Sequence, residues 1–365
     1  MALPVSQSDI NAYTTIEIVP RTTDVIFKKS PLLTRLLNRN SIQFEGGTAI
    51  QRPLMYAQLN GGFFSKNDTL NIAYVQTDTS VNVNLKYAYV SIFLNGTDDV
   101  LNRGRNAAFS EVELKFANAS ATMAKILTTG IYQDGQSTAA NVASSTGPVL
   151  STSTSFDGLL AWIDDGNSSG TYSTATDSTK SFAAIGGITR TDLFVTAPTF
   201  TAATTPNSGI QGLNAYTNRA FNAFTLNDVQ FAFGQAWFGN DFPDLIVTTQ
   251  NGFNKVWNAT QPQQRYMDDT SDVAKVGFKA FRFNGVADVV VDKYIPSDAV
   301  NGIMYGLNTR YLEYFVSVNR KFAFGFTGFK DAQGTIDLAG QFLFSGNLVA
   351  PNPRTSFKLV GTALL

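Results

Sequence analysis

Apolar and polar residues alternate most clearly between residues 46 and 95. A strand is predicted from 81 to 89, with one apolar face made of Val81, Val83, Leu85, Tyr87 and Tyr89. An earlier strand at 50–56 leads into a polar, glycine-rich stretch at 60–68. We therefore predict a long two-stranded ribbon. Because an isolated ribbon is only marginally stable in water, its apolar stripe should lie against its own domain or a neighbouring subunit.

The strongest helical pattern begins at Ala107. Apolar residues then recur three or four positions apart, as on one face of a helix: Phe109, Val112, Phe116, Ala119, Met123, Ile126 and Leu127. This pattern predicts one helix of about 24 residues, or ~36 Å at about 1.5 Å per residue. It should bury that face, and Gly130 is its expected C-terminal stop.

Shorter elements surround this helix. We predict short helices at 30–37, with Pro31 in the first turn, and at 156–163, and further helices at about 215–238 and from 251 onward. A buried strand is expected at 244–249, so that residues 211–265 form a compact α/β unit. The C-terminal strands are expected at 278–283, 286–291, 315–318, 322–329, 341–344 and 356–360. The fold class is therefore α+β.

Composition narrows the possible chemistry. The chain has 365 residues, no His and no Cys, which excludes disulfides, Cys/His zinc sites, cysteine nucleophiles and Ser-His-Asp triads. Lys+Arg 27 against Asp+Glu 28 gives a net charge of −1, so no global basic field attracts nucleic acid. Only 15% of residues are charged, and surface depleted in charge is typical of subunit contacts. We expect a structural protein and no enzyme.

Individual residues support no catalytic, cofactor or metal site. The adjacent acids are expected to serve turns or helix caps: Asp98 and Asp99, Asp164 and Asp165, Asp268 and Asp269. The segment 331–337 has too few ligands for a calcium loop and is expected to form a hairpin turn. The arginines are scattered; Arg103 and Arg105 could contact phosphate or a neighbour's carboxylate, and an ion pair is the expected role.

Aromatic clusters and the N-terminal sequence complete the pattern. The clusters at 63–64, 231–238 and 322–329 are expected to lie in the core or in interfaces. The first residues have neither the basic region nor the apolar stretch of a signal peptide. No run approaches the ~18 apolar residues of a transmembrane helix.

The order of elements and many short stretches carry a family resemblance. The stretches are RPLMYAQLNGGFF, VNVNLKYAYVSIFLNG, DDVLNRGRNAAFSEVELKFANASATMAKILTTGIYQDG, FDGLLAWIDDG, IGGITR, PDLIVTTQNGFNKVW, QPQQRY, FNGVADVVVDKYIP, MYGLNTRYLEYFV and GNLVAPNPRTSFKLVG. From about residue 45 to the C-terminus, the chain resembles the tailed-bacteriophage major capsid protein family, with its Hong Kong 97-like fold. The resemblance implies an N-terminal arm (1–45), an extended loop (46–95), a peripheral domain with a spine helix (96–134), an axial domain (135–265) and peripheral strands with the return to the C-terminus (266–365).

The resemblance also implies a function. The chain would be a coat protein that assembles through pentamers and hexamers into an icosahedral shell around packaged double-stranded DNA. Its location would be the virion, after assembly in the bacterial cytoplasm, with no membrane and no cofactor. Its expected partners are copies of itself, a portal, a separate scaffold, possible decoration proteins and, without specificity, the packaged DNA. Some members crosslink a loop lysine; Lys66 occupies the matching loop, but no partner asparagine is identifiable, so no crosslink is expected.

Two alternatives come from other classes of protein. An outer-membrane-type β-barrel would share the richness in Asn, Thr, Gly and aromatic residues, but it requires a signal peptide and regular alternating strands. A carboxylate-based phage hydrolase would require two acids brought together by the fold.

Overall fold

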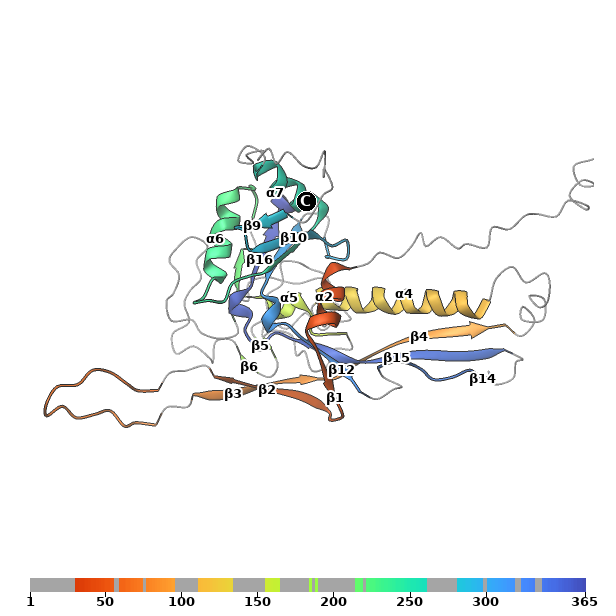
Figure 1. Cartoon of the computed structure of the whole chain (residues 1–365), viewed down its shortest axis with the longest axis horizontal. Helices are drawn as coiled ribbons and strands as arrows, with labels where there is room; N and C mark the ends of the chain where they lie inside the picture. Colours follow the sequence, from red (N-terminus) through yellow and green to blue (C-terminus); the bar gives the residue numbers. More distant parts are fainter. Residues whose placement is uncertain are drawn as a thin grey trace, which may run out of the picture.

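The computed structural model shows two sheets stacked one above the other, with a long ribbon that leaves the body at one end (Figure 1). It describes residues 30–55, 59–74, 77–95, 111–133, 155–164, 184–185, 188–189, 214–218, 221–260, 281–297, 301–318, 323–331 and 337–365. Within these ranges, no helix combines the length and the apolar character needed to cross a membrane.

The lower sheet is built around one long strand, β15 (Leu338–Val349). The strand order is β1-β12-β15-β13, and β4 and β14 also pair with β15. Its other members are β1 (Ser41–Phe44), β4 (Lys86–Leu94), β12 (Glu313–Ser317), β13 (Ala323–Phe326) and β14 (Lys330–Asp331). β4 runs antiparallel to β15 from Lys86, opposite Gly346, to Leu94, opposite Leu338. The predicted strand at 341–344 is thus one part of a much longer element.

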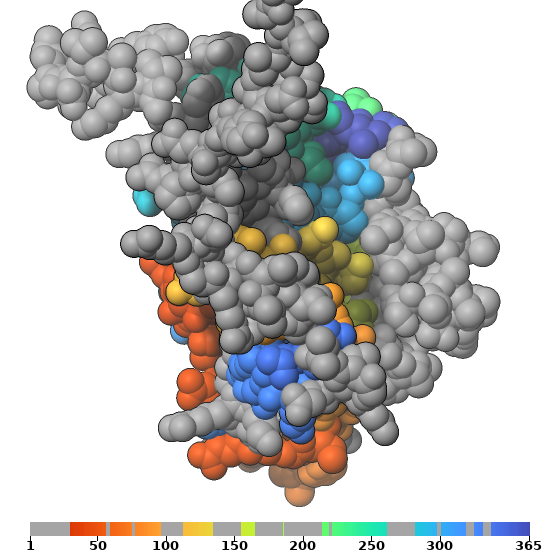
Figure 2. Space-filling view, turned by 90° about the vertical axis from the view of Figure 1, so that its right-hand side faces the viewer, coloured from red at the N-terminus to blue at the C-terminus, as the bar shows by residue number. Residues whose placement is uncertain are grey.

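The long helix predicted from the apolar spacing is α4 (Glu111–Tyr132), which lies along β4 and β15 (Figure 1). In the end-on view of Figure 2, the late strands of the lower sheet (blue) lie below this helix (yellow). Phe116 connects the helix to the lower sheet. Its ring packs edge-on against Phe326, Phe329 and Phe342, with centroid separations of 4.8, 5.9 and 5.4 Å.

Two details of the predicted helix were wrong. Val112 and Ile126 are exposed, so the buried face is narrower than the full set of apolar positions. Gly130 does not end the helix, which continues to Tyr132. Instead, Gly130 lies against the ring of Phe156, where an added Cβ would meet Cδ2 at 2.8 Å. The expected first positions, 107–110, lie outside the described residues.

The upper sheet has the strand order β7-β16-β11-β8-β10-β9. Its strands are β7 (Tyr216–Asn218), β8 (Leu245–Thr248), β9 (Phe281–Phe283), β10 (Ala287–Val291), β11 (Gly302–Leu307) and β16 (Phe357–Gly361). One face carries a core with α6 (Leu226–Ala236) and α7 (Gln250–Thr260), and the other face carries a second core toward the lower sheet. Because both faces are covered, every residue of β8 and β11 is buried.

The predicted helix at 215–238 is confirmed only over α6. Tyr216–Asn218 instead pairs in parallel with β16. The helix begins after Thr225, whose hydroxyl accepts a hydrogen bond from the backbone N–H of Asp228 (3.1 Å) and caps the N-terminus. The buried strand at 244–249 and the following helix are confirmed as β8 and α7.

The boundary expected at residue 265, between the axial domain and the peripheral strands, does not coincide with the boundary between the two sheets. Residues 281–307 and 357–361, which the resemblance assigned to peripheral strands, lie in the upper sheet beside β8. β11 was not predicted at all. β10 lies parallel to β8 and β7 parallel to β16, whereas β11 runs antiparallel to both of its neighbours, β8 and β16. This order joins segments that lie far apart in the sequence, so it follows from tertiary packing.

Two short helices fill the space between the sheets. The prediction at 30–37 is confirmed as α2 (Pro31–Arg39), and the prediction at 156–163 as α5 (Leu159–Trp162). The indole N–H of Trp162 donates to the carbonyl of Leu348 (3.0 Å). The remaining short elements are β5 (Ala184–Ile185), β6 (Ile188–Thr189), η5 (Thr309–Tyr311), η6 (Pro353–Thr355) and η7 (Thr362–Leu364).

Candidate assembly surface

The ribbon predicted from the sequence is formed by β2 (Ala49–Met55) and β3 (Asp78–Asn84). They pair antiparallel, with Ala49 opposite Asn84 and Met55 opposite Asp78. Val81 and Val83 are buried, and they belong to the core between the two sheets. The base of the ribbon is therefore held by the chain's own core, which is one of the two predicted locations of its apolar stripe, the other being a neighbouring subunit.

The apolar face of the ribbon does not continue into β4. Tyr87 and Tyr89 were expected beside Val83, but they are 64% and 67% exposed, whereas Lys86 is buried. The strand is interrupted at Leu85, where the chain leaves β2 and begins to pair with β15. One residue outside the regular strand reverses the alternation, so each later side chain points to the opposite face. The ribbon thus ends at Asn84, and β4 belongs to the lower sheet.

A buried polar cluster anchors this change of direction. The amide of Asn347 donates to the carbonyl of Asn84 (2.8 Å) and to Oδ2 of Asp157 (2.9 Å). Nζ of Lys86 lies 4.0 Å from Oδ1 of Asp157. Burial raises the pKa of Asp157 to about 6, and attraction to Lys86 and the Asn347 hydrogen bond only partly oppose it. Burial also lowers the pKa of Lys86.

Beyond the ribbon strands, residues 59–74 form a loop that extends far from the body (Figure 1). A turn at its tip is closed by hydrogen bonds from the N–H of Ser65 to Oδ2 of Asp68 (2.5 Å) and from the N–H of Asp68 to the carbonyl of Ser65 (3.1 Å). Asn67 has a positive φ of 82°, which Asn tolerates in turns. Lys66 lies in this turn and is exposed.

The loop carries large apolar side chains without a covering surface. We call this set the apolar tip: Leu59, Phe63, Phe64, Leu70, Ile72 and Tyr74. Each has more than half of its surface exposed, and Phe63, Ile72 and Tyr74 exceed 90%. Exposed apolar groups gathered in this way are typical of protein–protein contact sites.

A second apolar surface lies on the outer side of β4. Tyr87, Tyr89 and Phe93 are exposed, while Lys86, Ile92 and Leu94 on the opposite side are buried. We call these three aromatic residues the β4 outer face. The sequence analysis did not predict this face, because it extended the alternation of buried and exposed residues from the ribbon strand into residues 86–89. The available signal was that both alternating sets of residues 86–94 are largely apolar, which is typical of a strand covered on both faces.

Of the acidic and basic candidates, only Asp164 and the two ends of the expected hairpin segment at 331–337 fall among the described residues. Asp164 is fully buried, and its Oδ1 lies 3.1 Å from Nζ of Lys358, which is equally buried. Asp331 pairs with Leu338 between β14 and β15, as the expected hairpin would have it. The other candidates lie outside the described residues: Asp98, Asp99, Arg103, Arg105, Asp165, Asp268 and Asp269. The described part of the chain holds no group of three side chains suited to a metal ion.

The aromatic clusters divide between core and surface. Phe326 and Phe329 pack against α4. Phe233 is the buried aromatic residue on α6, whereas Phe231, Trp237 and Phe238 of the same cluster are exposed. Phe63 and Phe64 are exposed in the apolar tip. Core packing is thus confirmed for Phe326, Phe329 and Phe233, whereas an interface role for Phe63 and Phe64 stays a prediction.

Comparison with known proteins identifies the fold. No protein-family model and no curated protein sequence matches the chain. Solved structures do match over nearly the whole length. A chain of the cyanophage A-1(L) capsid asymmetric unit is 16% identical with a TM-score of 0.61, covering 95% of this chain and 96% of that one. The capsid of the native GTA particle is 12% identical with a TM-score of 0.57, covering 99% and 100%.

The SrpI encapsulin complex of Synechococcus elongatus PCC 7942 is also similar, at 8% identity and a TM-score of 0.52, covering 98% of this chain and 94% of that one. All three cover at least 95% of this chain. The chain therefore has the fold of phage and GTA capsid proteins.

Proposed function

We propose that this chain is the major capsid protein of a tailed bacteriophage. It assembles through pentamers and hexamers into an icosahedral shell that encloses packaged double-stranded DNA. The observation that carries the proposal is the apolar tip, which the ribbon holds outside the body and which the other described residues leave exposed. The capsid fold supplies the setting.

The ribbon explains how assembly would gain stability. Its base is fixed by Val81 and Val83 in the core, so the loop is presented at a defined position. Burying one large apolar side chain contributes about 1.5–3 kcal/mol. Two phenylalanines at the tip would therefore contribute roughly 3–6 kcal/mol per contact before ordering costs. In a closed shell each subunit makes several such contacts, and these act together.

The finer assignments belong to the same proposal. The arm (1–45) and the extended loop (46–95) are anchored in the chain's own body by α2, β1 and β4, and their remaining parts reach neighbouring subunits. In the same proposal, α4 is the spine of a peripheral part and the upper sheet forms the axial part. The shell would work with a portal, a separate scaffold and possible decoration proteins, and it would be assembled in the host cytoplasm. The net charge of −1 suits a wall that touches DNA without holding it tightly. No enzymatic role is proposed.

A second candidate is a shell that encloses protein cargo, and the encapsulin neighbour supports it. The coat protein and the cargo shell are distinguished by expressing the full chain alone and together with the other structural proteins of its phage. Sedimentation velocity and negative-stain microscopy would show rings of five or six subunits, or closed shells, if the proposal is right. Nuclease-protected DNA inside the shells supports the coat protein. Shells formed by the chain alone that retain protein and never DNA support the second candidate, and a monomer under every condition refutes both.

A further inference from the structure

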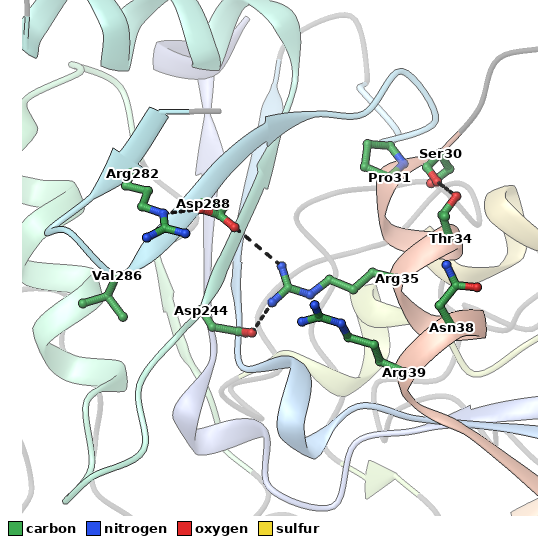
Figure 3. A pocket seen from close by; sticks show the side chains of 10 residues that line it. All are labelled: Ser30, Pro31, Thr34, Arg35, Asn38, Arg39, Asp244, Arg282, Val286 and Asp288. Carbon is green, nitrogen blue, oxygen red and sulfur yellow. Dashed lines mark hydrogen bonds and ion pairs between the residues drawn. The ribbon is translucent and has the colours of Figure 1, made fainter. Parts of the chain in front are cut away.

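A hollow of about 640 Å³ lies between α2 and one edge of the upper sheet (Figure 3). Three separate segments line it. Arg35, Asn38 and Arg39 come from α2, Asp244 precedes β8, and Arg282 and Asp288 form a cross-strand pair between β9 and β10. Three arginines against two aspartates leave a formal charge of +1 in the lining.

Both carboxylates in the lining are already occupied. Asp244 accepts hydrogen bonds from the backbone N–H of Thr309 (2.7 Å), from its hydroxyl (2.6 Å) and from Nη2 of Arg35 (2.5 Å). Asp288 accepts from Nε of Arg282 at 3.0 Å, and its other oxygen lies 4.0 Å from Nη1 of Arg35. These acceptors are therefore engaged by groups of the chain itself.

Several donors, in contrast, remain unused. Within the described residues, Arg39 makes no ion pair and no hydrogen bond through its side chain, and neither does the amide of Asn38. Nε of Arg35 is buried without an acceptor among the same residues. Arg35 and Arg39 lie one helical turn apart on α2 and both line the hollow, and Figure 3 shows both side chains directed from α2 toward the strands. Two neighbouring positive charges and unused N–H groups favour an anionic oxygen ligand.

The walls of the hollow are fixed before any ligand arrives. At the start of α2, the hydroxyl of Ser30 donates to Asp292, which also accepts from the hydroxyl of Tyr132 (2.9 Å). At its end, the amide of Asn40 donates to the carbonyl of Leu312 (2.9 Å). Because α2 is held at both ends, the backbone that carries Arg39 needs no rearrangement on binding.

We propose that this hollow binds an acidic side chain, Asp or Glu, from a second copy of the chain. A carboxylate matches the planar fork of a guanidinium, and one negative charge balances the +1 of the lining. A polyanion such as nucleic acid fits less well, because Asp244 and Asp288 would repel its further phosphates. The inference rests on the proposed assembly, since it requires a neighbouring subunit.

The test compares assembly of the full chain with that of Arg39→Ala and Arg39→Lys. Sedimentation velocity gives the concentration at which half of the subunits are assembled. We expect Arg39→Ala to raise it at least about tenfold, and Arg39→Lys to raise it less because one positive charge remains. Lys125→Ala removes an exposed charge on α4 and should leave it within about twofold. Added NaCl should weaken wild-type assembly more than that of Arg39→Ala.

Each other outcome overturns the inference. If wild-type chain assembles and Arg39→Ala assembles equally well, the hollow takes no neighbour's acid, although the proposed function stands. If Arg39→Ala leaves assembly unchanged but abolishes binding of a DNA duplex of about 20 base pairs, measured by fluorescence anisotropy, the ligand is a nucleic-acid phosphate. If it lowers the melting temperature of the unassembled subunit and leaves assembly unchanged, the ligand is an acid of the same chain. If wild-type chain never assembles, the proposed function itself fails.

Discussion

The buried ion pair between Asp164 and Lys358 gives the sharpest stability prediction. The two side chains are completely buried, and Nζ of Lys358 donates both to Asp164 (3.1 Å) and to the carbonyl of Leu160 (3.3 Å). The pair joins the end of α5 to β16 of the upper sheet. Replacing one partner by a neutral residue of similar size leaves the other as an uncompensated buried charge.

Asp164→Asn and Lys358→Met should each lower the free energy of unfolding by about 3–5 kcal/mol. The double variant Asp164→Leu with Lys358→Met removes both charges, so it should come within about 1 kcal/mol of wild type or exceed it. The exposed pair of Arg310 and Asp241, 76% and 26% exposed, provides the control. Arg310→Met should change stability by about 0–1 kcal/mol.

Guanidinium unfolding of the unassembled subunit measures these differences. Trp162 is fully buried two residues before Asp164, so its fluorescence reports directly on this region. A loss below about 1 kcal/mol for both single variants would refute the reasoning, because a solvated pair would behave in that way. A double variant as unstable as the sum of the single variants would refute it as well.

Three further predictions concern other parts of the molecule. Burial raises the pKa of Asp157 to about 6, so the folded chain holds this proton more tightly than the unfolded chain. The stability gained from the protonated carboxyl is fully present below about pH 4 and is lost as pH rises through 6. Wild type should therefore lose about 3 kcal/mol relative to Asp157→Asn between pH 4 and pH 8, and parallel denaturation curves at every pH would contradict this. Gly130→Ala should cost about 1 kcal/mol despite better helix propensity, because its Cβ meets the buried ring of Phe156; a higher melting temperature would show that the ring yields. Changing Phe63 and Phe64 together to Ser should suppress assembly in sedimentation while the subunit's melting temperature stays constant, and unchanged assembly would remove the apolar tip from the interface.

Local patterns determined much of the fold. The spacing of apolar residues predicted α4, Pro31 after Ser30 predicted the start of α2, and the apolar run at 245–248 predicted a buried strand. These features depend on neighbours within one or two turns of helix or a few residues of strand. The absence of His and Cys and the low charge likewise favoured subunit contact over catalysis as the function of this chain.

Contacts between distant segments decided the rest. The sequence could not show that the alternation reverses at Leu85, because the reversal depends on Asn347, 263 positions beyond Asn84, and on the pairing of β4 with β15. It also could not pair Asp164 with Lys358, 194 positions apart. Partners of buried charges and of strands depend on which surfaces meet in the folded chain. The local spacing of apolar residues does not predict these long-range pairs.

The apolar tip and the hollow beside α2 differ in the same way: local sequence predicts the first, and only tertiary structure forms the second. The sequence alone placed Phe63 and Phe64 in a polar, glycine-rich stretch between two strands, because such a stretch is a local signal. Only the tertiary structure brought Arg35 and Arg39 together with Asp244, Arg282 and Asp288, because α2 packs beside strands more than 200 residues further along the chain. The loop follows from local composition, whereas the charged hollow exists only where the fold closes long stretches of chain onto one another.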